Sequence, residues 1–390
     1  MTRSVAIIAI FLATTLAWII LGSTIMARTY SSESGLGPRV AQTWGGEQKQ
    51  TPPVPTSWHW QQGKTAWEMV PSPVTLEQSR IRVGLNLEQR QKGLLWFATY
   101  RVAFHGEYRV RLSAPADQLQ IKFAFPAADA IYDDLVVRID GRNVPTATAN
   151  GAITATLNKP PEVSLVEIGY RSQGSGVWRY THGDTVAQIR DFTLDMTTDF
   201  DRIDFPQGSL SPTIKRKLDR GWQLTWKYSN LVAGRDIAMV MPEKLQPGPV
   251  AGRISFFAPV SLLFFFFLIF IITTLKKIDL HPMHYFFLAA SFFAFHLLLA
   301  YLVDHISIHL AFAICSAVSI FLVVSYLRIV AGPRFAFVEA ALTQLVYLVG
   351  FSYAFFFQGF TGLAVTIGAI VTLFVVMQMT ARVDWSAKPA

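Results

Sequence analysis

Six long apolar runs limit what this chain can fold into. Roughly 20 helical residues cross the ~30 Å hydrocarbon core of a bilayer, so an apolar run of that length predicts a transmembrane helix. The runs cover residues 4–26, 254–275, 284–303, 306–330, 335–357 and 361–380. We therefore expect a membrane α-helical bundle of six transmembrane helices, in which one helix is N-terminal and five follow residue 252.

The first run has two interpretations. A cleaved signal peptide has an apolar core of about 7–15 residues and ends at a small-residue site. The run at 4–26 is longer, and its nearest site, Ile25-Met26-Ala27, begins with a large residue. We favour an uncleaved anchor over residues 1–27, and the signal peptide stays open as the alternative.

The placement of positive charge predicts the orientation. Basic residues concentrate on the cytoplasmic side of membrane proteins. The loops "VDHIS" and "FQGFTG" carry no Lys or Arg. The basic residues near the other ends of the spans are Arg3, Lys276, Lys277, Arg328, Arg334, Arg382 and Lys388. We expect a multi-pass inner-membrane protein with both termini in the cytoplasm and residues 28–252 in the periplasm, although Arg3 and Arg28 balance each other across the first span.

The segment between the first two spans predicts a β domain. Residues 28–78 are rich in Ser, Gly, Pro and Gln, which indicates a linker or irregular lead-in. In residues 79–252 polar and apolar side chains alternate, and Asp140-Gly141 and Asn150-Gly151 are typical two-residue hairpin turns. We expect an inserted, all-β, antiparallel, sandwich-like domain or open barrel there, then the five-helix region at 253–380 and a tail at 381–390.

Charge and cysteine content argue against a nucleic-acid-binding protein and against a disulfide-stabilised domain. The net charge is +8, but no basic run is dense enough to predict a nucleic-acid partner. The single cysteine, Cys315, lies in the fourth predicted span. The β domain therefore has no disulfide, and its core has to hold it together unaided.

Two clusters in the external domain have a functional and a structural interpretation. The tryptophans of "SWHWQQGKTAW" are Trp58, Trp60 and Trp67, which either bind sugars or a bilayer interface or simply pack. A carboxylate run, Asp191, Asp195, Asp199, Asp201 and Asp204, resembles a Ca²⁺ site in composition only. We favour packing or an interface for the tryptophans and a charged sheet edge for the carboxylates.

The sequence offers little support for a catalytic function. There is no G-x-S-x-G, H-E-x-x-H, P-loop, G-x-G-x-x-G or C-x-x-C pattern. We expect no catalytic residue, no metal, no cofactor and no enzymatic activity. An intramembrane enzyme is the interpretation with the least support.

Polar residues inside the predicted spans are the best candidate site, because ionisable groups in a membrane face the bundle interior. His296 lies near the middle of the third span, and Glu339, Thr343 and Tyr347 share a helical face of the fifth. They form either a proton or substrate path or a set of interhelical hydrogen bonds. We favour hydrogen bonding, in which Glu339 reaches toward the cytoplasmic interface.

A second candidate cluster lies at the turn between the third and fourth spans. Asp304, His305 and His309 are an acceptable ligand set for a divalent metal, but the pattern is short. We do not expect a metal there.

The stretch "KKIDLHPMHYFF", residues 276–287, connects the second and third spans. Pro282 lacks an N–H and suits the first turn of a helix, so this stretch is an elbow between helices rather than a metal clip.

The elbow carries a family resemblance. Leu280, His281, Pro282 and Met283 form a Leu-His-Pro-Met elbow, and Asp304-His305 follows the next aromatic span. The C-terminal "RVDW" includes Arg382, Asp384 and Trp385. These motifs resemble the CreD family of inner-membrane proteins, with Asp304 where that family has Glu. The external domain is shorter than the family's.

The resemblance implies a role in cell envelope integrity, induction by a two-component system, and no catalytic residues. We expect a non-enzymatic protein that contacts membrane lipids and binds an envelope protein through its β domain, for example by strand addition. The alternative is a transporter or lipid-handling protein that uses the polar residues of the bundle.

Overall fold

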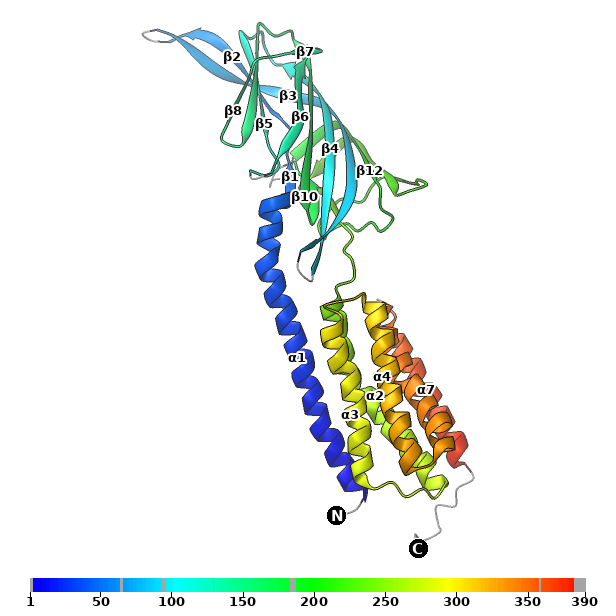
Figure 1. Cartoon of the computed structure of the whole chain (residues 1–390). Coiled ribbons are helices and arrows are strands. Elements are labelled where there is room, and N and C mark those ends of the chain that lie inside the picture. Colours follow the sequence, from blue (N-terminus) through cyan, green and yellow to red (C-terminus); the bar gives the residue numbers. More distant parts are fainter. Residues whose placement is uncertain are drawn as a thin grey trace. The chain divides into compact units, whose positions relative to one another are not determined.

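The computed structural model describes residues 3–63, 66–92, 95–128, 130–182, 187–357 and 359–381. The chain divides into two compact units. One is helical and combines Met1–Glu33 with Leu245–Ala390, and the other, Ser34–Lys244, is rich in strands (Figure 1).

The helical unit contains the predicted apolar runs. Its helices are α1 (Arg3–Trp44), α2 (Pro247–Leu275), α3 (Pro282–Leu302), α4 (Ile308–Val330), a composite helix over 335–356, and α7 (Thr361–Thr380). Within the described residues, six helices are long and apolar enough, by length and composition, to cross a membrane. Each contains or coincides with one predicted run, apart from a few residues at its ends.

Local signals place the helix ends. Proline stands at the start of α2 and of α3, where a missing N–H costs nothing. At the start of α3 the side chain of His281 also accepts a hydrogen bond from the Met283 amide at 3.3 Å. The elbow is therefore a helix cap.

The composite helix departs from regular α geometry. Two π segments, η1 (Phe335–Ala340) and η2 (Leu345–Gly350), flank α5 (Ala341–Gln344), and α6 (Phe351–Tyr353) and the 3₁₀ turn η3 (Ala354–Phe356) complete it. A π turn holds more residues than an α turn, so spacing of four does not keep side chains strictly aligned.

The helices share one apolar core. Its largest buried members include Trp18 of α1, Phe265 of α2, and Phe292 and Phe295 of α3. The Trp18 ring packs edge-on against Phe293 of α3, with ring centroids 5.6 Å apart.

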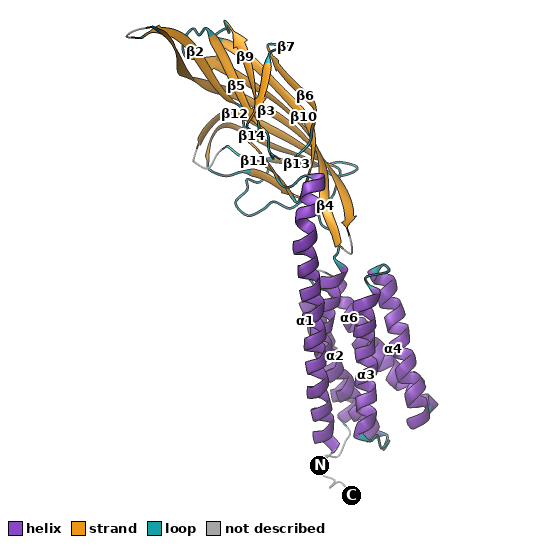
Figure 2. Ribbon diagram, turned by 60° about the vertical axis from the view of Figure 1, so that its left-hand side comes forward, coloured by secondary structure: helices purple, strands orange, loops and turns teal. Residues whose placement is uncertain are grey.

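The second unit contains one large sheet and one small sheet (Figure 2). The large sheet is ordered β7-β6-β10-β4-β3-β2-β5-β9-β8, with β12, β14 and β13 branching from β3. These strands are β2 (Val54–Gln62), β3 (Trp67–Lys92), β4 (Leu95–Leu112), β5 (Gln118–Ala124), β6 (Tyr132–Ile139), β7 (Arg142–Asn143), β8 (Thr146–Ala149), β9 (Ala152–Asn158), β10 (Val163–Ser175), β12 (Ala187–Thr198), β13 (Ile214–Lys217) and β14 (Trp222–Ala233). The small sheet is β1 (Gln48–Gln50), β11 (Val177–Tyr180) and β15 (Ile237–Val240).

The expectation of a large β-rich domain is confirmed, but its strands are not all antiparallel. β12 pairs with β3 in parallel, as does β1 with β11. Strands that pair in parallel are joined by long connections. The alternation of polar and apolar residues within one strand does not show which strand it pairs with, or in which direction. Twelve strands join in one sheet, so the sandwich-like form of our expectation, which also allowed an open barrel, is not confirmed.

Both predicted hairpin turns are confirmed. Asp140 and Gly141 have φ of 53° and 73°, and they join β6 to β7. Asn150 and Gly151 have φ of 51° and 68°, and they join β8 to β9.

The expected irregular lead-in at 28–78 is wrong. Helix α1 continues to Trp44 with Pro38 inside it, and β1, β2 and the first part of β3 occupy residues 48–78. Prolines such as Pro55 and Pro73 lie within the paired strands β2 and β3. Turn-type composition was misleading there because tertiary pairing outweighs local propensity.

A single core holds the β unit together without a disulfide. The inner faces of the strands supply buried residues such as Val83, Phe104, Ile121, Phe192 and Trp226. Cys315, the chain's single cysteine, is buried in α4 of the other unit.

Candidate functional site

His296 is enclosed by aromatic rings. It is 1% exposed, and its Nδ1 lies 2.8 Å from the Phe292 carbonyl oxygen, one turn earlier in α3. A carbonyl only accepts, so Nδ1 carries the proton and Nε2 is left as an acceptor. Nε2 has no partner among the described residues, and the ring packs edge-on against Trp18 and Phe295, with centroids 5.7 and 4.8 Å away.

Glu339 lies elsewhere and has its own partner. Its carboxylate forms an ion pair with Lys276, the residue that follows α2. His296 stands 14 residues into α3, which is about 21 Å of helix beyond the elbow that follows Lys276. The described structure therefore does not bring Glu339 and His296 together.

Thr343 and Tyr347 bond to backbone and to other helices. The Thr343 hydroxyl donates to the Glu339 carbonyl at 2.6 Å. The Tyr347 hydroxyl lies 2.6 Å from Thr372 Oγ1 of α7, and its carbonyl accepts from Ser261 of α2. The contacts of Tyr347 join three helices, whereas the hydrogen bonds of Thr343 and His296 stay within their own helices.

Sequence reasoning missed a further polar connection. Gln344 is fully buried, and its Nε2 donates to Ser319 Oγ of α4 at 2.8 Å. The Ser319 hydroxyl donates in turn to the Ser291 carbonyl of α3 at 2.7 Å. An amide within an apolar run is the signal that would have identified it, because such residues bond across helices in membranes.

The external-turn cluster divides into separate contacts. Asp304 forms an ion pair with Arg28 of α1 at 3.1 Å, and Arg28 also donates to the Ala300 carbonyl at 2.8 Å. The His309 ring instead packs tilted against that of Phe356, with ring centroids 5.0 Å apart, and His305 is exposed. Among the described residues no three His, Cys, Asp or Glu side chains are grouped to hold a metal.

The elbow motif divides its roles among four residues. Leu280 is fully buried in the helical core, His281 caps α3, and Pro282 begins it, whereas Met283 is exposed. The motif residues Arg382, Asp384 and Trp385 lie outside the described residues.

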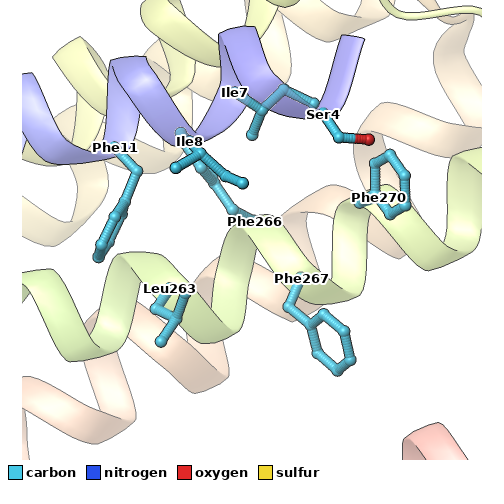
Figure 3. Close-up of a pocket in the computed structure, with 8 residues that line it drawn as sticks. All are labelled: Ser4, Ile7, Ile8, Phe11, Leu263, Phe266, Phe267 and Phe270. Atoms are coloured by element: carbon cyan, nitrogen blue, oxygen red, sulfur yellow. The ribbon is translucent and has the colours of Figure 1, made fainter. Parts of the chain in front are cut away.

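A groove on the helical unit is apolar (Figure 3). It has a volume of about 290 Å³ and lies between α1 and α2. Its lining residues are Ser4, Ile7, Ile8, Phe11, Leu263, Phe266, Phe267 and Phe270. In a membrane span such a surface suits acyl chains, and it offers no group for chemistry.

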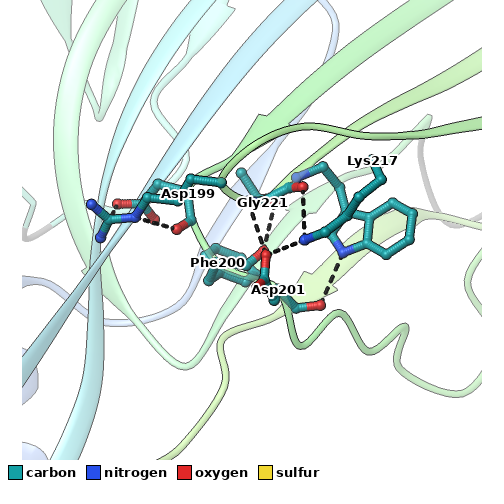
Figure 4. A network of polar contacts seen from close by, with 8 residues as sticks. Asp199, Phe200, Asp201, Lys217 and Gly221 are labelled. Carbon is teal, nitrogen blue, oxygen red and sulfur yellow. Dashed lines mark hydrogen bonds and ion pairs between the residues drawn. The ribbon is translucent and has the colours of Figure 1, made fainter.

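The carboxylate run is used by the protein itself (Figure 4). Asp201 binds the ammonium of Lys217 and accepts from the Gly221 amide at 3.0 Å. Asp199 accepts from the Leu87 amide at 2.8 Å, and Asp195 from the Thr225 hydroxyl at 2.5 Å. The hydrogen bond from Lys217 lowers the pKa of Asp201. These groups connect strands and turns, so they are neither a calcium loop nor only a charged edge.

His182 is a second histidine that the sequence did not single out. Its ring packs edge-on against Tyr180 and Phe192, with centroids 5.2 and 4.9 Å away. Burial lowers its pKa to about 4, although the nearby Asp236 carboxylate opposes that shift. The ring is therefore neutral at pH 7.

The surface of the β unit offers two features for binding. Strand β8 pairs with β9 on one side, and its other edge has no partner strand among the described residues. The hairpin of β2 and β3 exposes Trp60 and Trp67 by 54% and 63%. We expected packing or an interface for the tryptophans. Packing in the core is wrong for these two, the interface stays a prediction, and Trp58 is half-buried.

Solved structures offer only distant likenesses. An M1 zinc metallopeptidase from Deinococcus radiodurans aligns with 43% of this chain and 42% of its own, at 11% identity and a TM-score of 0.30. A leukotriene A4 hydrolase from Saccharomyces cerevisiae aligns with 43% of this chain and 29% of its own, at 10% identity and a TM-score of 0.25. The chain thus spans less than half of either protein, and likenesses this weak say nothing about its activity.

The sequence comparisons point to one family. No curated protein matches the chain. One family, described as "Inner membrane protein CreD", matches residues 249–386, which contain α3 to α7, nearly all of α2, and the C-terminal motif. Over residues 249–386 the chain therefore matches the CreD family of inner-membrane proteins, which confirms the resemblance drawn from its elbow and C-terminal motifs.

Proposed function

We propose that this chain is a multi-pass protein of the bacterial inner membrane that keeps its β unit in the periplasm and both termini in the cytoplasm. The asymmetry of Lys and Arg around the later spans supports this orientation. Arg28, at the other end of the first span, opposes this orientation, although it is paired with Asp304 at 3.1 Å.

Accessibility of introduced cysteines tests the orientation. The background is Cys315→Ser, since this is the chain's one native cysteine. Lys159→Cys, on the β unit, should react with a membrane-impermeant maleimide in intact spheroplasts, whereas Lys277→Cys should react only after lysis. Labelling of Lys277→Cys alone in intact spheroplasts would invert the proposed topology.

The proposed role is support of cell envelope integrity by binding, without a reaction of the chain's own. The observation that carries it is the free edge of β8. All four residues, Thr146 to Ala149, are exposed, and none is charged. Natural edge strands are usually protected by charge, proline or a bulge, so a neutral open edge favours an added strand. The proposed partner is an extended segment of an envelope protein.

The hairpin geometry shows which backbone groups are free. Ala149 and Ala152 flank a two-residue turn, so they and the pair Ala147–Thr154 exchange hydrogen bonds. Thr146 and Thr148 alternate with them and direct their amide groups toward the open edge. The free amide of Thr148 is therefore available to a partner strand.

One substitution removes that amide alone. Thr148→Pro deletes the outward N–H and leaves the bonds between β8 and β9, whereas Thr148→Val keeps the N–H and is the matched control. A photo-crosslinking residue at Ala147 should capture an envelope protein in the Thr148→Val background and lose it in Thr148→Pro. Equal capture in both backgrounds would rule out strand addition at β8.

The alternative, a transporter or lipid-handling bundle, has less support. The polar side chains Tyr347, Gln344 and Glu339 have partners on other helices or beside them. His296 differs because it has no hydrogen-bond partner on another helix among the described residues: its Nδ1 bonds within α3 and its Nε2 has no partner. His296→Phe should keep function under the binding proposal, and loss of function with an intact fold would favour the alternative.

A further inference from the structure

The β2–β3 hairpin has two different faces. Residues directly opposite in an antiparallel pair project to the same side. The pairs Trp58–Pro71, Trp60–Met69 and Gln62–Trp67 therefore share one face, which we call the tryptophan face. The intervening pairs, which include His59, Gln61 and Glu68, form the other face, where Ser72 Oγ lies 3.2 Å from His59 Nδ1.

Three tryptophans are thus aligned on one side of a ribbon. Rows on the same face of a strand are about 7 Å apart, and diagonal neighbours across strands are about 7–8 Å apart. Trp58, Trp60 and Trp67 occupy three successive rows. β5 pairs with β2 only as far as Trp58, so the hairpin extends beyond the neighbouring strand (Figure 2).

The tryptophan face continues onto rows of uncharged polar residues, and the Asp117 carboxylate lies beside it, where Oδ2 accepts a hydrogen bond from the Trp60 amide at 2.9 Å. Trp58 pairs with Gln118, and Gln118 pairs with Asn158 of β9. The next row along holds Thr56, Gln120 and Thr156. Gln120 Nε2 donates to Gln118 Oε1 at 3.0 Å, and Gln118 Nε2 donates to Asn158 Oδ1 at 3.1 Å, which places these amides on one face. The charged side chain of these rows, Lys122, lies in the row beyond, away from the tryptophans.

We propose that this surface binds a linear, neutral, β-linked glycan. A pyranose ring has a flat C–H face that stacks on an indole, and its equatorial hydroxyls project from the ring edge. Indoles provide a large flat apolar surface with a negative π-face. Gln and Asn amides each offer both a donor and an acceptor, so they match hydroxyls without requiring charge.

The alternatives fit this surface less well. Insertion into a bilayer would also dehydrate the other face of the ribbon, where Glu68 is exposed, and a carboxylate in hydrocarbon is costly. An anionic polymer would require a cluster of Lys or Arg, and these rows contain Lys122 alone. The inference goes beyond strand addition at β8 and does not depend on it, because Thr148→Pro leaves the tryptophan face unchanged.

Binding to defined glycans tests the inference. The full chain in detergent is titrated with chitohexaose and cellohexaose and is sedimented with purified peptidoglycan sacculi, with heparin as the anionic control. Wild-type protein should bind chitohexaose or cellohexaose and not heparin, and binding to sacculi reports the same glycan backbone in its natural, carboxylate-bearing form. Trp60→Ala/Trp67→Ala should raise the Kd at least about tenfold. Both side chains are mostly exposed, so the variant keeps its fold.

Matched variants separate the face from the hairpin. Gln61→Ala and Glu68→Ala alter the other side of the same ribbon and should bind as the wild type does, and Trp60→Phe/Trp67→Phe should recover part of the affinity. The proposal is wrong if the wild type binds neither chitohexaose nor cellohexaose, or if the double alanine variant binds them within twofold of the wild type. It is also wrong if the two tryptophans are needed for capture of a protein at Ala147 but not for glycan binding.

Discussion

Arg28 of α1 binds Asp304 and the Ala300 carbonyl together, at 3.1 and 2.8 Å. One guanidinium thus ties the first helix to the end of α3 and to the turn that follows it. This is a long-range contact within the helical unit, since 276 positions separate Arg28 from Asp304. The Arg28 side chain is 40% exposed and that of Asp304 19%, so the pair is partly screened.

Removal of this tie should loosen α1 from the bundle. Arg28→Ala should lower the free energy of unfolding by about 1–2 kcal/mol, because a charge-assisted pair and a carbonyl lose their donor. Thermal unfolding in detergent measures the change. Lys277→Ala is the control, since no side-chain contact is described for that exposed lysine. Equal stability of the two variants would show that the pair contributes nothing.

The loss of stability should differ according to which partner of the Gln344–Ser319 hydrogen bond is removed. Ser319→Ala leaves a buried Gln344 amide N–H without an acceptor and should cost about 1–2 kcal/mol. Gln344→Leu removes the amide itself. It should cost less, because the Ser319 hydroxyl keeps its hydrogen bond to the Ser291 carbonyl. Unfolding measurements on the two variants check the order, and a greater loss in Gln344→Leu would contradict it.

His182 should make the β unit sensitive to mild acid. Burial lowers its pKa from 6.5 to about 4, so the folded unit resists protonation that the unfolded chain accepts. Its contribution is complete above pH 6.5 and is lost as the pH falls toward 4, on the order of 3 kcal/mol in total. His182→Phe should remove that part of the pH dependence, which hydrogen exchange in β12 reports. Identical profiles for the two proteins would refute the assignment.

The Asp201 carboxylate should stabilise the β unit down to a lower pH than His182 does. The bond from Lys217 lowers its pKa, so its contribution is present above the unfolded value of about 3.9 and is lost as the pH falls through the folded value. Asp201→Asn should weaken the turn at Gly221 at pH 7 and make no difference well below pH 3. If Asp201→Asn were less stable than the wild type by the same amount at every pH, the charge of Asp201 would not be the cause.

Gly221 should be intolerant of any side chain. Its φ is +80°, and a Cβ there would lie 1.8 Å from the Thr198 carbonyl oxygen. Gly221→Ala should therefore destabilise the β unit by about 3 kcal/mol or more, since strain and a backbone clash add. Gly151→Ala is the control, because its φ is also positive but a Cβ there meets nothing within 4 Å. Similar losses in both variants would exclude the clash.

The sequence predicted the helices well for a physical reason. A bilayer demands one long apolar segment per crossing, so each of the six long apolar helices leaves a local signature in the sequence. The turns at Asn150-Gly151 and Asp140-Gly141 were equally readable, since positive φ restricts the residue type.

What the sequence did not reveal depends on contacts between distant residues. The parallel pairing of Phe192 with Ser79 joins strands more than 100 positions apart, and no local pattern specifies it. The proposed path through His296 and Glu339 relied on polarity alone. Their partners, Trp18 and Lys276, lie on other helices or at their ends and became apparent only once the helices were packed.

The central claim is that the β unit acts by holding an envelope protein at the edge of β8. Native mass spectrometry of the gently extracted full chain tests it most directly. We predict one stoichiometric envelope protein on the wild type and on Thr148→Val, and its loss from Thr148→Pro. A stoichiometric lipid or small molecule with no protein, unchanged in Thr148→Pro but lost in His296→Phe, would contradict the claim and place the function in the bundle.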